Sequence, residues 1–392
     1  MCGTSDRGAW YLAEMINLEW RKVFVAVAVV LGTSCTGTST CNTCAQEDGG
    51  VGAAGGEAGG GSAGGGSAGG GSAGGGSVGG VGGGAATLPA WRRALALNAW
   101  AEIPGTSGAA GATVDPWGAL AENKATAELY IAASGGHSDG SDNRVVSISL
   151  MDDAPTWTVR RASSTNPVAD VLYYPDGLPT SRHLYHHLHY LPASNRVLLG
   201  GCRFGYGGGT PTGPGMDAFD LTTNQWLPRN TFADITPFNG YVVEIDGAGA
   251  AWTTGGLRFV PSTNTWSKPG NGPGLGRFPQ ATAAARNIVF SLQFGDGQGY
   301  DLNLGVVARR LDITTGNSVA ISFTASPALT QFMTSQPNYA GMDFDAANDR
   351  FLFYHGGETG TVYVITPNAT TTWDMSILTT TGMPTATPTS GA

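Results

Sequence analysis

From Leu88 onward, short runs of alternating apolar and polar residues are separated by glycine, proline and polar turns, and helical periodicity is almost absent. The clearest unit has a first strand over residues 183–191, a turn over 192–195 and a second apolar strand over 196–199 that ends in Gly200-Gly201. A variable loop, a third strand over 216–220, a short turn and Trp226 complete it. This order predicts a small antiparallel sheet of four strands.

The unit returns five times along the chain. The glycine pairs or their equivalents are Gly135-Gly136, Gly200-Gly201, Gly255-Gly256, Gly295 with Gly297, and Gly356-Gly357. The tryptophans that follow them are Trp157, Trp226, Trp266 and Trp373, and the fourth unit lacks one. Trp100 resembles the fourth-strand tryptophan of a sixth unit, but the first three strands of that unit do not precede it. Repeats of four short strands at irregular spacing predict the blades of a β-propeller.

Glycine pairs that end the second strand, with an apolar third strand and a tryptophan in the fourth, resemble the kelch repeat, which also builds the central domain of galactose oxidase. The resemblance covers roughly residues 98–375. It implies an all-β, kelch-like β-propeller with five recognisable blades and one incomplete blade. We expect six blades, with residues 379–392 as a Thr/Pro-rich tail of a truncated chain. A five-bladed ring with a spare strand is the alternative.

The N-terminal part has the sequence pattern of an export signal. Arg21 and Lys22 precede an unbroken apolar run over residues 23–31, and small residues lead to Cys35. The run is too short to span a bilayer, and the pattern is typical of a secretory signal. The residues before Cys35 resemble a bacterial lipoprotein cleavage site. This leaves two alternatives: cleavage before Cys35 with lipidation of that cysteine, or ordinary signal-peptide cleavage near Ser34. We therefore assign residues 1–35 to a signal-like segment and expect an extracellular or envelope-attached protein.

Residues 36–87 are dominated by glycine, serine and alanine, with Gly-Gly-Gly-Ser-Ala repeated between Gly59 and Ser77. Such a linker cannot bury apolar surface and spans on the order of 30–40 Å as a flexible coil. We expect it to hold a propeller over residues 88–378 away from an anchor.

With 12% charged residues and a net charge of −9, the chain lacks the basic surface that binding to nucleic acid requires. We expect a monomer that contacts the membrane only if a lipid anchor is attached at Cys35.

A candidate ligand face follows from strand direction. Because neighbouring strands are antiparallel, the loop from strand two to three and the loop from strand four to the next blade lie at one end of the wheel. Charged, imidazole and phenol groups fall in these loops, and function tends to reside on loops held by a rigid scaffold. The candidate ligand-binding residues are His137, Asp139, Arg182, His183, Arg203, Tyr206, Asp296, His355 and Glu358.

Residues 183–190 hold four of the six histidines. Alternation along a strand places His183, His187 and His189 on one side, which makes them candidate metal ligands. No carboxylate or cysteine accompanies them in this stretch, so we interpret them as hydrogen-bonded structural histidines and assign no metal.

The galactose oxidase resemblance implies a copper site with a Tyr-His pair, a tyrosine cross-linked to cysteine and a further histidine from a C-terminal domain. Tyr185-His186 looks like the pair, but Cys202 is the only cysteine after Cys44, and the sequence contains no such domain. We therefore expect no copper and no other cofactor. Our interpretation is a secreted or surface-tethered binding module for glycan or protein ligands. The alternative is an extracellular carbohydrate-active enzyme of the galactose oxidase type.

Overall fold

The computed structural model describes residues 88–96, 98–101, 103, 119–134, 140–184, 187–200, 205–207, 216–233, 242–270, 274–275, 279–295, 301–337, 340–355 and 361–382. The signal-like segment, the glycine-rich linker and most of the tail lie outside these residues. In the described part, no helix has the length and apolar character that a bilayer crossing requires.

Five sheets make up almost the whole structure, and each has four antiparallel strands that follow one another in the chain. Blade 1 contains β1 (Ala121–Asn123), β2 (Glu128–Ala132), β3 (Val145–Ser149) and β4 (Thr158–Arg161). Blade 2 contains β5 (Leu188–Leu191), β6 (Arg196–Gly200), β7 (Met216–Asp220) and β8 (Gln225–Trp226). Blade 3 contains β9 (Val242–Ile245), β10 (Ala251–Thr253), β11 (Arg258–Val260) and β12 (Thr265–Ser267).

Blade 4 contains β13 (Gln280–Ala283), β14 (Ile288–Phe294), β15 (Val306–Asp312) and β16 (Ser318–Ala320). Blade 5 contains β18 (Gly341–Asp345), β19 (Arg350–Tyr354), β20 (Val362–Thr366) and β21 (Thr372–Leu378), with β17 (Ser322–Phe323) as an added fifth strand. The helices are short: α2 (Ala90–Arg93) and α3 (Pro327–Ser335), with 3₁₀ turns η3 (Pro192–Ser194), η4 (Ala284–Arg286) and η5 (Leu302–Leu304).

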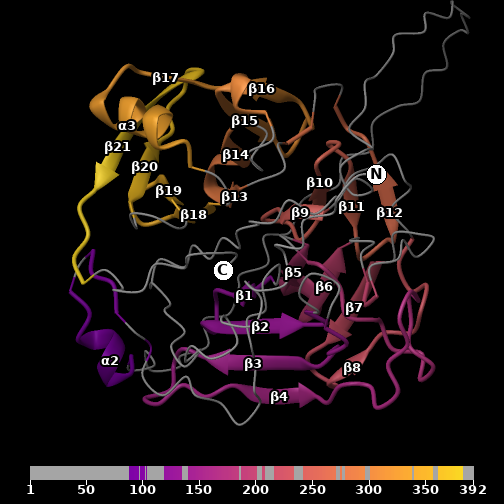
Figure 1. The fold of residues 1–392 in the computed structure, drawn as a ribbon. Helices are drawn as coiled ribbons and strands as arrows, with labels where there is room; N and C mark the ends of the chain where they lie inside the picture. The colour runs from indigo at the N-terminus through magenta and orange to yellow at the C-terminus, as the bar shows by residue number, and fades with distance from the viewer. Residues whose placement is uncertain are drawn as a thin grey trace, which may run out of the picture.

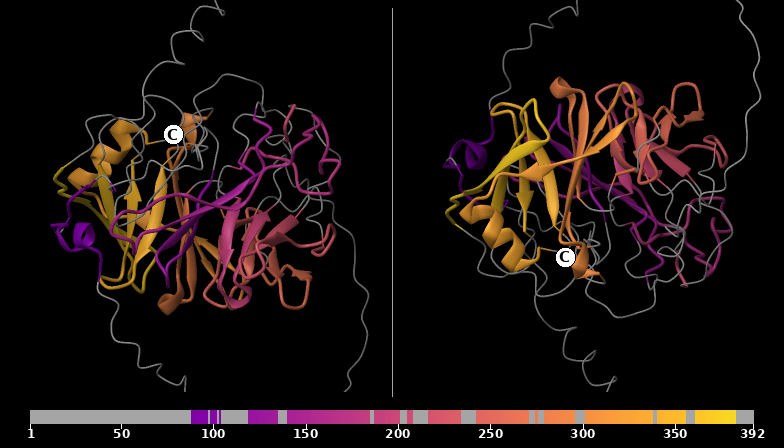
Figure 2. Two further views of the ribbon diagram at one scale, coloured as in Figure 1. Left: turned by 90° about the horizontal axis from the view of Figure 1, so that it is seen from below. Right: turned by 90° about the horizontal axis from the view of Figure 1, so that it is seen from above.

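The five sheets are arranged radially. The first strand of each blade lies nearest the middle, and consecutive first strands contact one another from blade 1 to blade 5. Figure 1 looks along the axis of the wheel, and Figure 2 shows it from two sides. This radial order of sequential four-stranded sheets is a β-propeller. The fold predicted from the sequence is confirmed.

Tight turns within the blades explain why asparagine recurs at fixed places. Asn195 and Asn287 adopt a left-handed backbone, with φ of 50° and 58°, directly before the second strands of blades 2 and 4. Asn224 and Asn264 do the same between the third and fourth strands of blades 2 and 3. Asparagine tolerates this conformation better than other residues with a side chain. These residues therefore fix where each strand pair turns.

Gly200 shows why a glycine ends the second strand of blade 2. A Cβ atom added there would lie 2.7 Å from the Cβ of Val242 in blade 3. Backbones from neighbouring blades approach closely near the axis, and only glycine fits at this distance. The predicted glycine, but not the full predicted first strand, is found: β5 begins at Leu188 rather than at His183.

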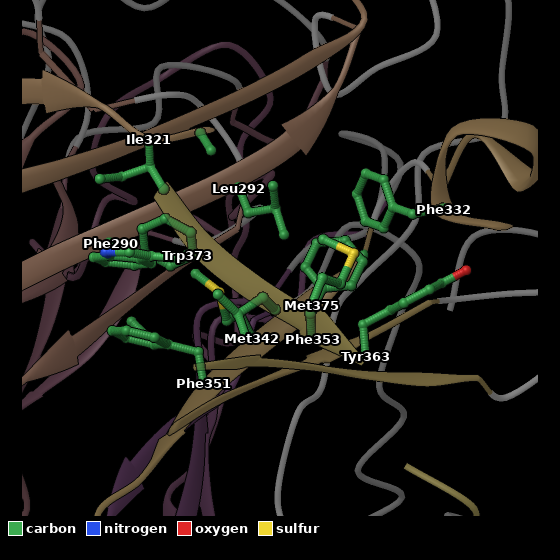
Figure 3. Close-up of a cluster of buried hydrophobic side chains, with 14 of the residues drawn as sticks. Phe290, Leu292, Ile321, Phe332, Met342, Phe351, Phe353, Tyr363, Trp373 and Met375 are labelled. Carbon is green, nitrogen blue, oxygen red and sulfur yellow. The ribbon is translucent and has the colours of Figure 1, made fainter. Parts of the chain in front are cut away.

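Each blade tryptophan packs toward the preceding blade. Trp373 of blade 5 lies 4.8 Å, ring centre to ring centre, from Phe290 of blade 4, within a cluster that also includes Phe351 (Figure 3). Trp226 joins a buried cluster with blade 1, and Trp266 packs against the cluster that blades 2 and 3 share. Large aromatic side chains bury extensive area, so these contacts hold neighbouring sheets together.

A sixth position between blades 5 and 1 is occupied by residues 98–103, as far as they are described. Trp100 packs against Tyr354 and other blade 5 residues, while Ile103 joins the buried cluster of blade 1. Ala99 and Thr381 form a parallel bridge, in which the Trp100 amide donates to the Thr381 carbonyl. Trp100 thus relates to blade 5 as Trp373 relates to blade 4. This segment is the incomplete sixth blade.

The outer side of blade 5 carries extra structure. β17 pairs in parallel with the start of β21, and α3 packs against the same strand. Phe332 of α3 is fully buried between Phe353 and Tyr363 (Figure 3). Ser326 caps this helix by accepting a hydrogen bond from the Leu329 amide. The insertion therefore covers the outermost strand of the blade.

Candidate functional site

One end of the wheel, which we name the loop face, carries the connections from second to third strands and from fourth strands to the next blade. Of the nine candidate residues there, Arg182, His183, Tyr206 and His355 are described. The other five, His137, Asp139, Arg203, Asp296 and Glu358, lie outside the described residues, as do Cys35, Tyr185, His186 and Cys202.

Three of the four described candidates are buried. Arg182, His183 and His355 are 1%, 0% and 5% exposed, while Tyr206 is half-buried. Such burial suits residues that hold the loops in place, because a ligand at the surface would not reach their side chains. Tyr206 is the described candidate that solvent reaches.

Arg182 links three segments of the loop face. Its guanidinium donates to Asp217 of β7 at 2.6 Å, and both side chains are almost fully buried. Its backbone amide donates to the Ala133 carbonyl after β2, and its backbone also bridges to Gly205. A buried charge needs a partner, and this pair provides one for each ion. Arg182 thereby fixes the loops of blades 1 and 2 to each other.

The connection from β4 to β5, from residue 162 to residue 187, is long and packed into the loop face. The Asn143 amide group donates to the Pro179 carbonyl at 2.8 Å, and the buried Tyr174 hydroxyl donates to the Ser141 carbonyl at 2.9 Å. The Tyr206 amide donates to the Ser181 carbonyl. Long loops in compact domains are usually functional. This one is held by hydrogen bonds to loops of two blades.

Tyr173, in the same connection, joins the buried ion pair. Its hydroxyl donates to Asp217 Oδ1 at 3.0 Å, and the guanidinium of Arg229, which follows β8, lies 4.5 Å from the centre of its ring. Burial, and then the negative charge of Asp217, raise the pKa of Tyr173 to about 12. The phenol therefore stays protonated and donates its hydrogen bond at neutral pH.

His187 and His189 meet at one backbone carbonyl. His187 Nδ1 lies 2.9 Å and His189 Nε2 lies 3.2 Å from the Val242 carbonyl oxygen. Since a carbonyl only accepts, each imidazole donates an N–H to it. These histidines connect blade 2 to blade 3. Within the described ranges, no group of three or more metal-ligating side chains comes together.

A charged cluster near the axis, formed by Glu122, Lys124, Glu244 and Asp343, brings together blades 1, 3 and 5. Lys124 forms an ion pair with Asp343, and both Glu122 and Glu244 lie within electrostatic range of these two residues. Burial raises the pKa of Glu244 to about 7 and also raises the pKa of Glu122. We name these four residues the axial cluster. It places a carboxyl group that titrates near neutral pH beside an ammonium group.

Sequence reasoning missed the axial cluster and the Tyr173–Arg229 pair. Glu122, Glu244 and Asp343 each lie within the short first strand of a blade. An acidic residue in the first strand of three repeats is a signal that could have pointed to the axis. Tyr173 and Arg229 come from separate connections, and no repeat marks them.

No protein-family model and no curated protein matches this sequence. Two examples from the solved structures that match it in fold follow. The structure of YjhT is 10% identical, with a TM-score of 0.37, over 71% of this chain and 99% of that chain. The GH74 xyloglucanase from Xanthomonas campestris is 14% identical, with a TM-score of 0.37, over 71% of this chain and 49% of that chain. At this level of similarity, the propeller assignment rests on the sheet topology itself.

Proposed function

We propose that this protein is an exported β-propeller that binds glycan ligands on its loop face without transforming them. The observation that carries the proposal is the 162–187 connection, which hydrogen bonds anchor to the loops of blades 1 and 2. Rigid loops on a stable scaffold suit ligand binding. The Tyr206 hydroxyl in this region can donate to and accept from sugar hydroxyls, while the Ser163 and Ser164 hydroxyls hydrogen-bond Asn143 and help to hold the connection in place.

A glycan array with the full chain tests the proposal. We expect binding that Tyr206→Ala weakens, because Tyr206 is the solvent-reached candidate on the loop face. Tyr190→Ala is the matched control, since Tyr190 is also half-buried but its hydroxyl bonds Asn195 at the opposite end. An empty array, together with an empty pull-down against cell-surface proteins, would contradict a binding role. Capture of a protein with an empty array would replace the glycan by a protein ligand.

The second candidate is an extracellular carbohydrate-active enzyme, and the axial cluster is the observation that favours it. Glu244 has a pKa of about 7, in the range of a general acid, while Asp343 is held as an ion pair with Lys124. Release of reducing ends or of hydrogen peroxide from polysaccharides, lost in Glu244→Gln, would support it. The absence of turnover on a broad polysaccharide panel would remove it.

A further inference from the structure

Arg229 presents an open guanidinium on the loop face. The group stacks on the Tyr173 ring at 4.5 Å, and the side chain is exposed. Within the described part of the chain, Arg229 forms no ion pair and no hydrogen bond. A cation–π contact of this kind leaves the guanidinium N–H groups without an oxygen acceptor. The edge of Arg229 is therefore available to a ligand.

The platform beneath Arg229 is rigid. The Tyr173 hydroxyl is fixed on Asp217, and the other oxygen of Asp217 is fixed by the buried guanidinium of Arg182. A side chain that is already ordered loses less conformational freedom when it binds. Arg229 is thus prepared for binding before a ligand arrives.

The charge balance at this point is positive. Two guanidinium groups surround one carboxylate around Tyr173, in a chain whose net charge is −9. Asp217 accepts from Tyr173 through one oxygen and from Arg182 through the other. An exposed guanidinium fork matches the two oxygens of a carboxylate.

We propose that Arg229, stacked on Tyr173, binds the carboxylate of a uronic acid residue within a glycan on the loop face. The inference rests on the proposed glycan-binding function and names the substrate class. A uronic acid carries one carboxylate surrounded by hydroxyl groups. That pattern fits a single exposed guanidinium with hydroxyl side chains on the same face, whereas an acidic peptide would match a group of several open cations.

The test is calorimetric titration of the full chain with oligogalacturonate and with its methyl ester. The ester keeps the sugar rings and removes the charge. We expect the ester to bind at least about tenfold more weakly, a difference of about 1.4 kcal/mol. The affinity for oligogalacturonate should fall with salt, because the contact is ionic. Equal affinity for acid and ester would overturn the assignment.

Variants locate the contact. Arg229→Gln should reduce oligogalacturonate affinity at least about tenfold, and Arg229→Lys should recover only part of it, because lysine lacks the planar fork. Tyr173→Leu should weaken binding through loss of the stacked ring. Arg310→Gln is the matched control. It also removes one positive charge, and Arg310 is a half-buried residue of β15 in blade 4. If Arg229→Gln and Arg310→Gln behave alike, the site is not at Arg229.

The outcomes separate the two proposals. Binding of neutral glycans in place of oligogalacturonate leaves the proposed function standing and removes the uronic acid. Tighter binding of poly-glutamate than of oligogalacturonate assigns Arg229 to acidic peptides and overturns the glycan. Failure of every glycan to bind removes the proposed function itself.

Discussion

Glu244→Gln tests the electrostatics of the axial cluster. The Glu244 carboxyl ionises near 4.5 when free in the unfolded chain and near 7 in the folded protein, chiefly because burial disfavours its charged form. Between these values the folded protein holds a proton that the unfolded chain has released. Wild-type stability should therefore fall as pH rises through this window. Glutamine does not ionise, so the variant escapes the penalty and keeps the hydrogen bond from the Ile245 amide.

The expected magnitude follows from the pKa. The interval from 4.5 to about 7 corresponds to at most about 3.5 kcal/mol at about 1.4 kcal/mol per pH unit. Glu244 is partly accessible to water, which reduces this to about 2 kcal/mol. Lys124 and Asp343 contribute smaller, opposite effects on the same pKa. The excess unfolding free energy of the variant over the wild type should be small at pH 5, grow as the pH rises toward 7, and reach about 2 kcal/mol at pH 8.

Urea unfolding of both proteins at pH 5, 6, 7 and 8 measures the difference. Glu128→Gln is the contrasting control. Burial raises the pKa of Glu128, but hydrogen bonds from Tyr130 and Arg160 outweigh it, and the pKa is lowered overall. The stability deficit of that variant relative to the wild type should be complete once the pH is above 4.5 and should stay constant from pH 5 to pH 8. A difference between Glu244→Gln and wild type that stays flat from pH 5 to pH 8 would refute the reasoning.

Three further substitutions test the scaffold, each by urea unfolding. Arg182→Met leaves Asp217 as an unpaired buried charge and should cost about 3–5 kcal/mol; a loss below about 1 kcal/mol would mean that Asp217 finds another partner. Trp373→Ala opens a cavity between blades 4 and 5 and should cost about 3–5 kcal/mol, and a small loss would contradict its role between the blades. Asn264→Val should cost about 1–2 kcal/mol more than Asn264→Gly, because both variants lose the side-chain hydrogen bonds to the Ala233 amide and the Thr231 carbonyl but only valine is strained at a φ of 53°.

The propeller could be predicted from the sequence because its determinants are local and repeated. A blade closes over a short stretch of chain, so its strands, its turn asparagines and its tryptophan recur in order. Trp100 could be assigned to an incomplete blade for the same reason, and its contact with Tyr354 follows the pattern of the other tryptophans. The start of β5 was predicted too early: the strand begins at Leu188, and His183, Leu184 and His187 before it are not part of a strand.

For the candidate site, the sequence predicts which end of the propeller to consider but not which residues a ligand would contact. Strand direction locates the loop face, but burial decides which of its polar residues a ligand meets. Arg182 and His183 look like surface groups in the sequence, and tertiary packing buries both. The Tyr173–Arg229 pair and the Lys124–Asp343 pair join segments that are far apart in the chain. No local sequence pattern therefore predicts these contacts.

The insertion that carries β17 and α3 bears on how copies of this protein behave in crowded conditions. The outermost strands of blades 1 to 4 are short: β8 has two residues, β12 and β16 have three, and β4 has four. β21 has seven, which makes it the longest rim strand of the described blades and the most open to pairing between molecules. It is also the strand that the insertion shields. Without residues 321–335, a long run of free amides and carbonyls would face outward, and wheels would adhere rim to rim.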